Sequence, residues 1–297
     1  MAKIIVWRSM LYVPSNNEKF LQKVNQRGAD AIILDLEDSI PLDQKSTARL
    51  GLASIVERLM NQKADILVRI NRPLVHAIPD LIAATIEGVD ALMLPKIDSS
   101  EHLQLLEEVV VEQEIKIGLK VGSIKFVPMI ETASGFFNMH QIAAASRRNA
   151  GITLGGEDFA LDTGMVPDSE TLFMASQKLV YAARAARIIP LGTIGTVADF
   201  KDLIAYKESA EKSQKFGFEG AACIHPGVVN ILNEEFSPKD HEVVAAKKII
   251  IAYEQALEEG RGAITVDGKM VDIPVVKRAK NLFERYNLIK DRDSNNF

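Results

Sequence analysis

Residues 31–40 read AIILDLEDSI, a stretch that joins a buried strand to an acidic turn. Ala31 to Leu34 form a continuous apolar run, which is typical of a parallel strand buried inside an α/β protein. Three carboxylates follow within four positions, at Asp35, Glu37 and Asp38. Carboxylates this close together repel one another and resist burial, so the stretch predicts a strand that ends in a polar site.

The same alternation of a short apolar run and a longer helical period recurs along most of the chain. Eight such units in about 230 residues is the count of a (β/α)8 TIM barrel, which is the fold that we predict. An open doubly wound sheet is the competing fold, but it usually has fewer units and often a GxGxxG loop, which the sequence lacks after its first strand. The apolar runs are residues 9–14, 29–35, 64–71, 89–96, 125–131, 150–156, 188–195 and 219–226.

The C-terminal part of the chain departs from this alternation. We predict a barrel domain over residues 1–235 and a helical extension over residues 236–297 that packs on a neighbouring subunit. Within the extension the pattern predicts helices over residues 240–260 and 275–289, joined by a turn segment, with a frayed polar end from residue 290. The extension is longer than barrel closure requires, which indicates a second role.

Composition restricts the class of protein. The chain has 297 residues, 47% of them hydrophobic, and a formal net charge of −5, which argues against a nucleic-acid partner. No apolar stretch approaches the roughly 18 residues of a membrane span, and the first residues lack a signal-like pattern. The single cysteine, Cys223, excludes an intrachain disulfide and is typical of a reducing compartment. We therefore expect a cytoplasmic enzyme without a membrane partner.

Polar residues gather where the predicted strands end, and a barrel of this kind has its active site at that end. Glu131 and Asp158 follow successive strands, so they should project into one mouth. Oxygen ligands without a Cys/His cluster favour Mg²⁺ or Mn²⁺ over zinc. The polar residues at the strand ends are Asp35, Glu37, Asp38, Arg69, Asn71, Lys96, Glu131, Glu157, Asp158 and His225.

Each of these residues also has a structural interpretation. Glu131 and Asp158 could each favour a helix N-terminus, where negative charge is stabilised. Arg69 could neutralise the acids instead of binding a substrate carboxylate. Lys96 could form a structural ion pair, and His225 could be a turn histidine with its hydrogen bonds satisfied.

In these motifs the sequence resembles the citrate lyase β-subunit-like family, which includes malyl-CoA and citramalyl-CoA lyases. The matching motifs occur in one order along nearly the whole chain. They are RSMLYVPSNN, GADAIILDLEDSIP, Lys45 to Arg49, VRIN, LPK, PMIET, GGEDFALDTG, IHP and GKMVDIP. The resemblance also implies a (β/α)8 barrel, in agreement with the fold predicted from periodicity.

The resemblance implies a role for particular residues at the mouth. Glu131 and Asp158 would bind Mg²⁺, and Arg69 would bind the carboxylate of the keto-acid half of the substrate. Glu37 and Asp38 would hold metal-bound waters, because outer groups of this kind orient a metal site.

Further residues would contact the substrate or the thioester carrier. The segment around Glu157 and Asp158 would touch the substrate, and Asp272 would be the acid–base residue presented to a neighbouring subunit. Positions near the CoA moiety would be Tyr12, Lys23, Ile224 and His225.

The implied reaction is the Mg²⁺-dependent cleavage, or formation, of a 3-hydroxy-3-carboxyacyl thioester. Its products are a keto acid and an acetyl thioester, and the carrier is CoA or an acyl carrier protein. We expect a homo-oligomer, a homotrimer or a hexamer. Ser15, the GVV after IHP and the absence of an aspartate near Gly192 depart from the family pattern at the carrier and acyl surfaces.

We predict a stand-alone lyase, with three alternatives left open. One is a true citrate lyase β subunit that acts on citryl-acyl carrier protein. Another is a class II pyruvate aldolase, which needs no thioester. The third is a non-catalytic homologue that binds an acyl thioester.

Overall fold

The computed structural model describes residues 5–196 and 200–294, and these divide into two compact units. The larger unit, Trp7–Phe236, contains an eight-stranded parallel sheet in the order β7-β6-β5-β4-β3-β2-β1-β8. An isolated bridge between Leu191 and Gly220 joins the two edge strands and nearly closes the sheet into a barrel. The (β/α)8 barrel prediction is therefore confirmed. The strands are β1 (Ser9–Pro14), β2 (Ala31–Asp35), β3 (Asp65–Arg69), β4 (Ala91–Leu94), β5 (Lys125–Ile130), β6 (Gly151–Leu154), β7 (Ile189–Leu191) and β8 (Ala221–Cys223).

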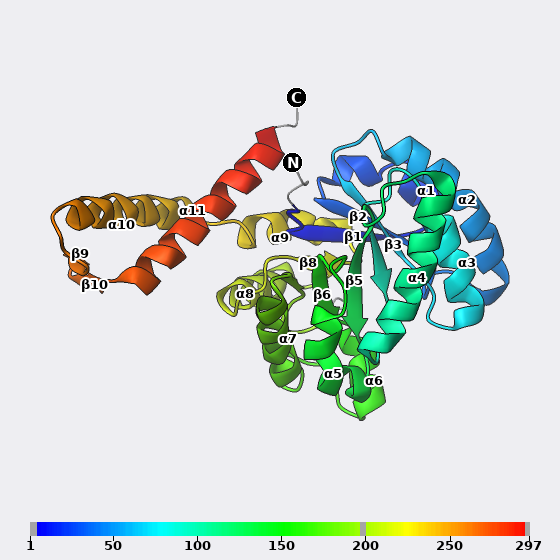
Figure 1. Ribbon diagram of the computed structural model, residues 1–297. Coiled ribbons are helices and arrows are strands. Elements are labelled where there is room, and N and C mark those ends of the chain that lie inside the picture. Colours follow the sequence, from blue (N-terminus) through cyan, green and yellow to red (C-terminus); the bar gives the residue numbers. More distant parts are fainter. Residues whose placement is uncertain (1–4, 197–199, 295–297) are drawn as a thin grey trace. The chain divides into compact units, whose positions relative to one another are not determined.

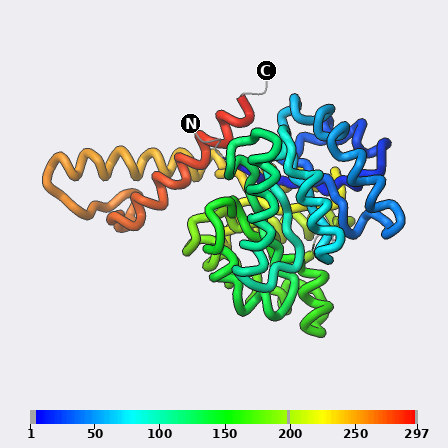
Figure 2. Tube along the Cα trace, turned by 45° about the vertical axis from the view of Figure 1, so that its right-hand side comes forward, coloured from blue at the N-terminus to red at the C-terminus, as the bar shows by residue number. Residues whose placement is uncertain are grey.

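Helices surround this sheet in the larger unit (Figures 1 and 2). The strands are apolar because both of their faces are covered: every residue of β2 and of β4 is buried. The helices of this unit are α1 (Glu18–Leu21), α2 (Lys45–Leu59), α3 (Leu74–Ala84), α4 (Ser100–Ile117), α5 (Ala133–Ala144), α6 (Gly156–Thr163), α7 (Phe173–Ala186), α8 (Leu203–Lys215) and α9 (Val229–Glu235). Short 3-10 turns cover Val24–Arg27, Leu42–Gln44 and Pro226–Val228.

Two local differences from the predicted pattern lie close to the mouth of the barrel. The segment after β1 is not one long helical period, because it breaks into α1 and the 3-10 turn Val24–Arg27. The helix α6 follows β6 within two residues and was not predicted from the sequence. It places Glu157 and Asp158 in its first turn, where the helix dipole stabilises negative charge.

The smaller unit contains α10 (Asp240–Glu258), β9 (Ile264–Val266), β10 (Lys269–Val271) and α11 (Ile273–Ser294). The segment expected as a turn is a β-hairpin, whose tip Asp267-Gly268 has positive φ at both residues. The polar end expected to fray from residue 290 is helical as far as Ser294, and residues 295–297 lie outside the described residues. Among the described residues, no helix combines the length and apolar character of a membrane span.

The parallel arrangement of the barrel unit decides where its polar residues meet. Strands β1 to β6 are paired in register, with Asp35 of β2 directly opposite Arg69 of β3. Since all strands run the same way, the residues that follow them lie at one end of the barrel. That end is the mouth of the barrel.

Candidate active site

Arg69, the last residue of β3, is held by carboxylates of the loop that follows β2. Its Nε and Nη2 donate to the two carboxylate oxygens of Asp35 at 2.7 and 2.9 Å. Its Nη1 lies 3.0 Å from Asp38 Oδ2 and 3.1 Å from Glu37 Oε2. The guanidinium also lies over the ring of Tyr12, 4.7 Å from the ring centroid. Asp35 thus fixes Arg69 bidentately, which is the strongest geometry for this pair.

The acids around Arg69 differ in the direction in which their pKa is shifted. Burial would raise the pKa of Asp35, but the hydrogen bond and charge of Arg69 hold that pKa below its usual value. Burial raises the pKa of Glu37 to about 8, and the nearby Arg69 only partly opposes this. Glu37 Oε2 is buried and accepts no hydrogen bond among the described residues, because Arg69 Nη1, although only 3.1 Å away, donates to Asp38 instead. Glu37 is therefore an incompletely paired acid beside a fully engaged arginine.

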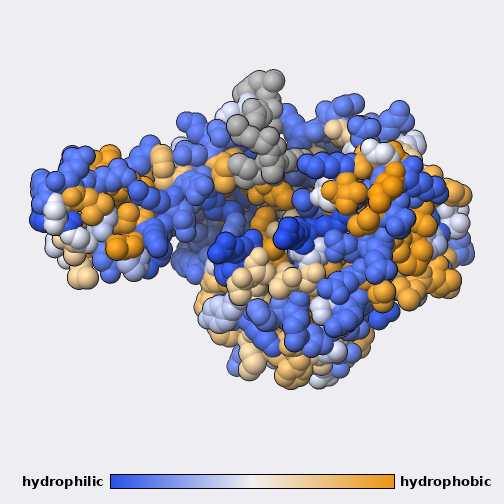
Figure 3. All heavy atoms as spheres, in the orientation of Figure 1, coloured by the Kyte–Doolittle hydropathy of each residue, from blue (hydrophilic) through white to orange (hydrophobic). Residues whose placement is uncertain are grey.

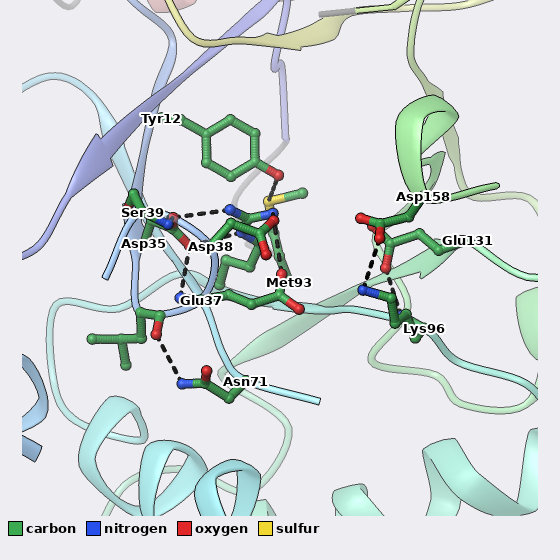
Figure 4. A network of polar contacts seen from close by, with 12 residues as sticks. Tyr12, Asp35, Glu37, Asp38, Ser39, Asn71, Met93, Lys96, Glu131 and Asp158 are labelled. Carbon is green, nitrogen blue, oxygen red and sulfur yellow. Dashed lines mark hydrogen bonds and ion pairs between the residues drawn. The ribbon is translucent and has the colours of Figure 1, made fainter. Parts of the chain in front are cut away.

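Across the mouth, Lys96 connects Glu131 and Asp158 (Figure 4). Glu131 directly follows β5, and its Oε2 accepts a hydrogen bond of 2.7 Å from the backbone N–H of Lys96. The ammonium of Lys96 lies 3.0 Å from Asp158 Oδ1. Burial raises the pKa of Glu131 to about 7, against the lowering effect of the Lys96 N–H. Two carboxylates from successive strands therefore meet here, as their spacing predicted.

Gly155 makes room for Glu131. A Cβ at Gly155 would lie 2.3 Å from Glu131 Oε1 and 2.5 Å from its Cγ, closer than real contacts allow. The glycine is therefore required for the observed position of the glutamate. The sequence motif GGEDFALDTG contains this residue, but the sequence alone does not reveal which side chain lies against it.

A cavity of about 670 Å³ opens at this end of the barrel. Of the predicted site residues, those that line it are Tyr12, Asp38, Arg69, Glu131, Glu157, Asp158, Ile224 and His225. Away from the acids, the lining includes Phe20, Val24 and Arg27 from the segment after β1. A concave, mostly apolar cavity with a few converging polar groups is typical of a small-molecule site.

Three predicted residues are placed differently from the rest. Glu37 is buried beside Arg69 and is not among the described residues that line the cavity. Lys23 is exposed and does not line the cavity either, whereas Arg27 of the same segment does. Asp272 belongs to the smaller unit, where its Oδ1 accepts a hydrogen bond from the N–H of Val275 at the start of α11.

Tyr12 and His225 have partners that the sequence did not indicate. The Tyr12 hydroxyl lies 3.9 Å from Met93 Sδ, and the Tyr12 ring packs against the guanidinium of Arg69. The ring of His225 stacks on Phe200 with centroids 5.0 Å apart, and its Nδ1 accepts a hydrogen bond from Gly227 N–H. Tyr12 therefore belongs to the Arg69 end of the cavity, while His225 belongs to the wall formed by the loops after β7 and β8.

The donor atoms at the mouth fit a hard divalent cation. No group of three or more His, Cys, Asp or Glu side chains able to hold a metal occurs among the described residues. Mg²⁺, however, needs only one or two protein carboxylates and keeps waters in its other positions. The cavity-lining acids Glu131 and Asp158 offer such a pair, with oxygen donors alone. The residues present are thus compatible with Mg²⁺ and do not form a closed structural site.

The fold and the mouth together define a class: a (β/α)8 enzyme with an oxygen-donor site where its strands end. Within that class, the family model described as HpcH/HpaI aldolase/citrate lyase matches residues 8–226. The chain belongs to this family.

Known relatives and a solved structure resemble nearly the whole chain. The citrate lyase subunit beta of Haemophilus influenzae is 34% identical, over 94% of this chain and 96% of the relative. The human mitochondrial citramalyl-CoA lyase is 27% identical, over 98% and 88%. The protein CitE of Mycobacterium tuberculosis, crystallised with magnesium, acetoacetate and coenzyme A, has a TM-score of 0.72 and 26% identity, over 94% of this chain and 97% of that one.

Proposed function

We propose that this protein is a Mg²⁺-dependent carbon–carbon lyase that cleaves, or forms, a 3-hydroxy-3-carboxyacyl thioester. The products of cleavage are a keto acid and an acetyl thioester. Membership of a family whose members include citrate and citramalyl-CoA lyases supports the reaction class. The observation that carries the proposal is the arrangement of Glu131 and Asp158 opposite Arg69 at the mouth of one cavity.

Glu131 and Asp158 would hold the cation, Mg²⁺ or alternatively Mn²⁺. Magnesium in the complex of the mycobacterial CitE supports the choice of metal. When bound, Mg²⁺ supplies Lewis acidity toward hydroxyl and carboxylate oxygens and so lowers the pKa of the hydroxyl. Glu37 and Asp38, on the facing loop, would orient water around the site.

Arg69 binds the carboxylate of the keto-acid half in this proposal. Asp35 and Tyr12 hold the guanidinium from behind and from its face, so its direction is set before the substrate arrives. Asp38 is the exchangeable partner, because 61% of its side chain is exposed while that of Asp35 is buried. A substrate carboxylate that replaces Asp38 would keep Arg69 charge-paired.

Asp272 is the proposed acid–base residue. In cleavage the substrate hydroxyl would give its proton to solvent and become the carbonyl of the keto acid, while the electron pair of the breaking C–C bond passes to the thioester as an enolate. Asp272 would then protonate the enolate carbon. In the direction of formation Asp272 would remove that proton. The carboxylate lies at the start of α11, and we propose that it reaches the mouth of a neighbouring subunit.

A carboxylate shared between subunits requires an oligomer, and we propose a homotrimer or a hexamer. The smaller unit is built from two helices and a hairpin, and one of its hydrophobic clusters has only three buried members, Tyr253, Val271 and Val276. Exposed apolar side chains also gather over α2, α3 and α4 of the barrel unit (Figure 3), among them Leu50, Val75 and Leu105. Both features support further packing against other copies.

Shared active sites can be tested by mixing two inactive variants. Asp272→Asn and Arg69→Ala proteins, mixed so that hetero-oligomers form, should recover part of the parent activity because some sites combine intact residues from both chains. Failure of demonstrably mixed oligomers to recover any activity would contradict the donated aspartate. Each variant mixed with itself is the control.

The rest of the cavity, lined by Phe20, Arg27, Ile224 and His225, would hold the thioester arm. We propose CoA as the carrier, a stand-alone enzyme and a cytoplasmic location; the buried free thiol of Cys223 is compatible with a reducing compartment.

A citrate lyase β subunit acting on citryl-acyl carrier protein is the second candidate. It is favoured by the 34% identity to such a subunit against 27% to the human citramalyl-CoA lyase.

Direct assay separates these possibilities. Citramalyl-CoA, malyl-CoA and citryl-acyl carrier protein are each incubated with the protein and Mg²⁺, and the release of keto acid and acetyl thioester is measured. Turnover of a CoA thioester supports the stand-alone enzyme, and turnover of the carrier substrate alone supports the subunit. Aldol cleavage without any thioester would support a pyruvate aldolase, and no turnover with any substrate would refute the lyase.

A further inference from the structure

Lys96 connects the two carboxylates of the proposed metal site from a third strand. It follows β4, whereas Glu131 follows β5 and Asp158 lies in α6 after β6. Its backbone N–H donates to Glu131 Oε2 at 2.7 Å, and its ammonium lies 3.0 Å from Asp158 Oδ1. Figure 4 shows all three residues together on one side of the mouth. One residue thus contacts both acids with two different groups.

The backbone of Lys96 is in an uncommon conformation. Its φ is +48°, in the left-handed region that residues other than glycine rarely adopt. This conformation lets the N–H reach Glu131 while the side chain reaches Asp158. Strained backbone of this kind persists where surrounding contacts over-determine it, and it clusters at functional sites.

The Lys96 ammonium is the positive charge next to Glu131 and Asp158. Arg69 is engaged by Asp35, Glu37 and Asp38 on the other side of the mouth. Among the ion pairs of the described residues, Asp158 pairs with Lys96. The side chains of Lys96 and Asp158 are 32% and 30% exposed, so the pair can exchange partners without unfolding the loop.

We propose that Lys96 is a positioning residue that acts as an internal counter-cation: it holds Glu131 and Asp158 in place for the divalent ion and gives up Asp158 when that ion binds. The inference rests on the proposed function, because it takes these two acids as the metal ligands. Two opposing effects follow from the geometry. The ammonium orders the acids, and it also competes with the ion for Asp158 by charge repulsion.

The test measures Mg²⁺ binding by calorimetry without substrate. Lys96→Met removes the charge at similar length, and Lys96→Gly removes it while adopting the left-handed backbone without strain. Both variants should bind Mg²⁺ about tenfold more tightly, because the competing charge is gone. Both should melt at a lower temperature than the parent in metal-free buffer and show a larger upward shift of melting temperature with Mg²⁺.

Two further variants separate charge from packing. Lys96→Arg keeps a cation beside Asp158 and should retain the parent affinity. Lys116→Met removes an equal charge from the exposed C-terminal end of α4 and should leave Mg²⁺ binding unchanged. Parent-like or weaker binding by both Lys96→Met and Lys96→Gly would overturn the inference.

The inference and the proposed function fail in distinguishable ways. If Asp158→Asn abolishes Mg²⁺ binding but the loss of the Lys96 charge does not tighten it, the counter-cation role alone is wrong. If the parent binds no Mg²⁺, or binds it equally well as Asp158→Asn, both are wrong.

Discussion

Charged residues are buried at both ends of the barrel, but their hydrogen-bond and ion-pair partners differ between the two ends. At the end where strands begin, Glu114 is fully buried and accepts Arg148 Nη1 and Nη2 at 2.9 and 2.6 Å. It accepts three more hydrogen bonds from residues 122–124. At the mouth, Glu131 accepts one, from Lys96, and Glu37 Oε2 accepts none among the described residues.

This difference appears in the pKa values. Burial would raise the pKa of Glu114, but the hydrogen bonds from Arg148 and the loop hold it below its usual value. Burial raises the pKa of Glu131 to about 7 and that of Glu37 to about 8, because their partners are too few to offset it. Complete pairing stabilises the fold, whereas incomplete pairing leaves an acid able to bind a cation or exchange a proton. The following experiments would break or sharpen this contrast.

Glu131→Gln should have the largest effect, and on activity alone. Loss of the charged ligand should lower Mg²⁺-dependent turnover about a thousandfold, or about 4 kcal/mol in transition-state stabilisation. The melting temperature should stay the same or rise, because a buried acid with a raised pKa has been replaced by a neutral group. Steady-state kinetics and thermal unfolding check both parts, and a strongly destabilised variant would contradict the contrast.

Glu114→Ala should show the opposite result. Arg148 would lose the fully buried carboxylate that it pairs with, keeping Glu107 at 3.1 Å, so the free energy of unfolding should fall by about 3 kcal/mol. Turnover of the folded fraction should match the parent, because both residues lie at the far end of the strands from the mouth. Urea denaturation and activity at low temperature measure these quantities, and an unchanged unfolding midpoint would show that the pair does not stabilise the fold.

Gly155→Ala should affect the mouth more mildly. The new methyl group would push Glu131 from its position, so Mg²⁺ affinity should fall by about tenfold to a hundredfold. Gly51→Ala in α2 is the matched control, since a Cβ there meets nothing within 4 Å and should raise stability by about 0.5–1 kcal/mol. Equal Mg²⁺ affinity in the two variants would mean that Gly155 does not position the glutamate.

Glu37→Gln should change the pH dependence of stability in metal-free buffer. The raised pKa means that the folded state holds this proton more tightly than the unfolded chain does. Its contribution to stability is present below the unfolded pKa and is lost as pH rises through about 8. Most of this loss falls between about pH 5 and pH 8, where the parent should lose on the order of 4 kcal/mol relative to the variant. Parallel stability curves over this range would contradict the raised pKa.

The sequence predicted the strands and most of the mouth because both depend on local patterns. Continuous apolar runs mark buried parallel strands, and the acids that follow them lie at one end by topology. The Asp35–Arg69 pair was less accessible, since it depends on the register between β2 and β3. The conformation of Lys96 was also out of reach, because nothing in LPK marks a lysine with positive φ.

For some elements that the sequence analysis did not predict, the sequence does contain an indication. Asp267-Gly268 is a standard hairpin dipeptide, and it indicates the hairpin of β9 and β10 within the segment expected as a turn. The break between α1 and the following 3-10 turn, and the short helix α6, had weaker signals because each spans few residues. The role proposed for Asp272 would depend on another chain, and the sequence indicates it only through the resemblance of GKMVDIP to the family motif.

The join between β7 and β8 has a consequence for motion. Among the described residues, this seam has the Leu191–Gly220 bridge and two hydrogen bonds, from Gly192 N–H to Gly220 O and from Glu219 N–H to Pro190 O, whereas β1 and β2 pair over five positions. Segments with few backbone hydrogen bonds open at lower free energy than fully paired ones. Local opening of the barrel should therefore require less free energy at the β7–β8 seam than between β1 and β2. Gly192 and Ala222, beside this seam, line the cavity. Amide hydrogens at the seam should exchange faster than those of β2.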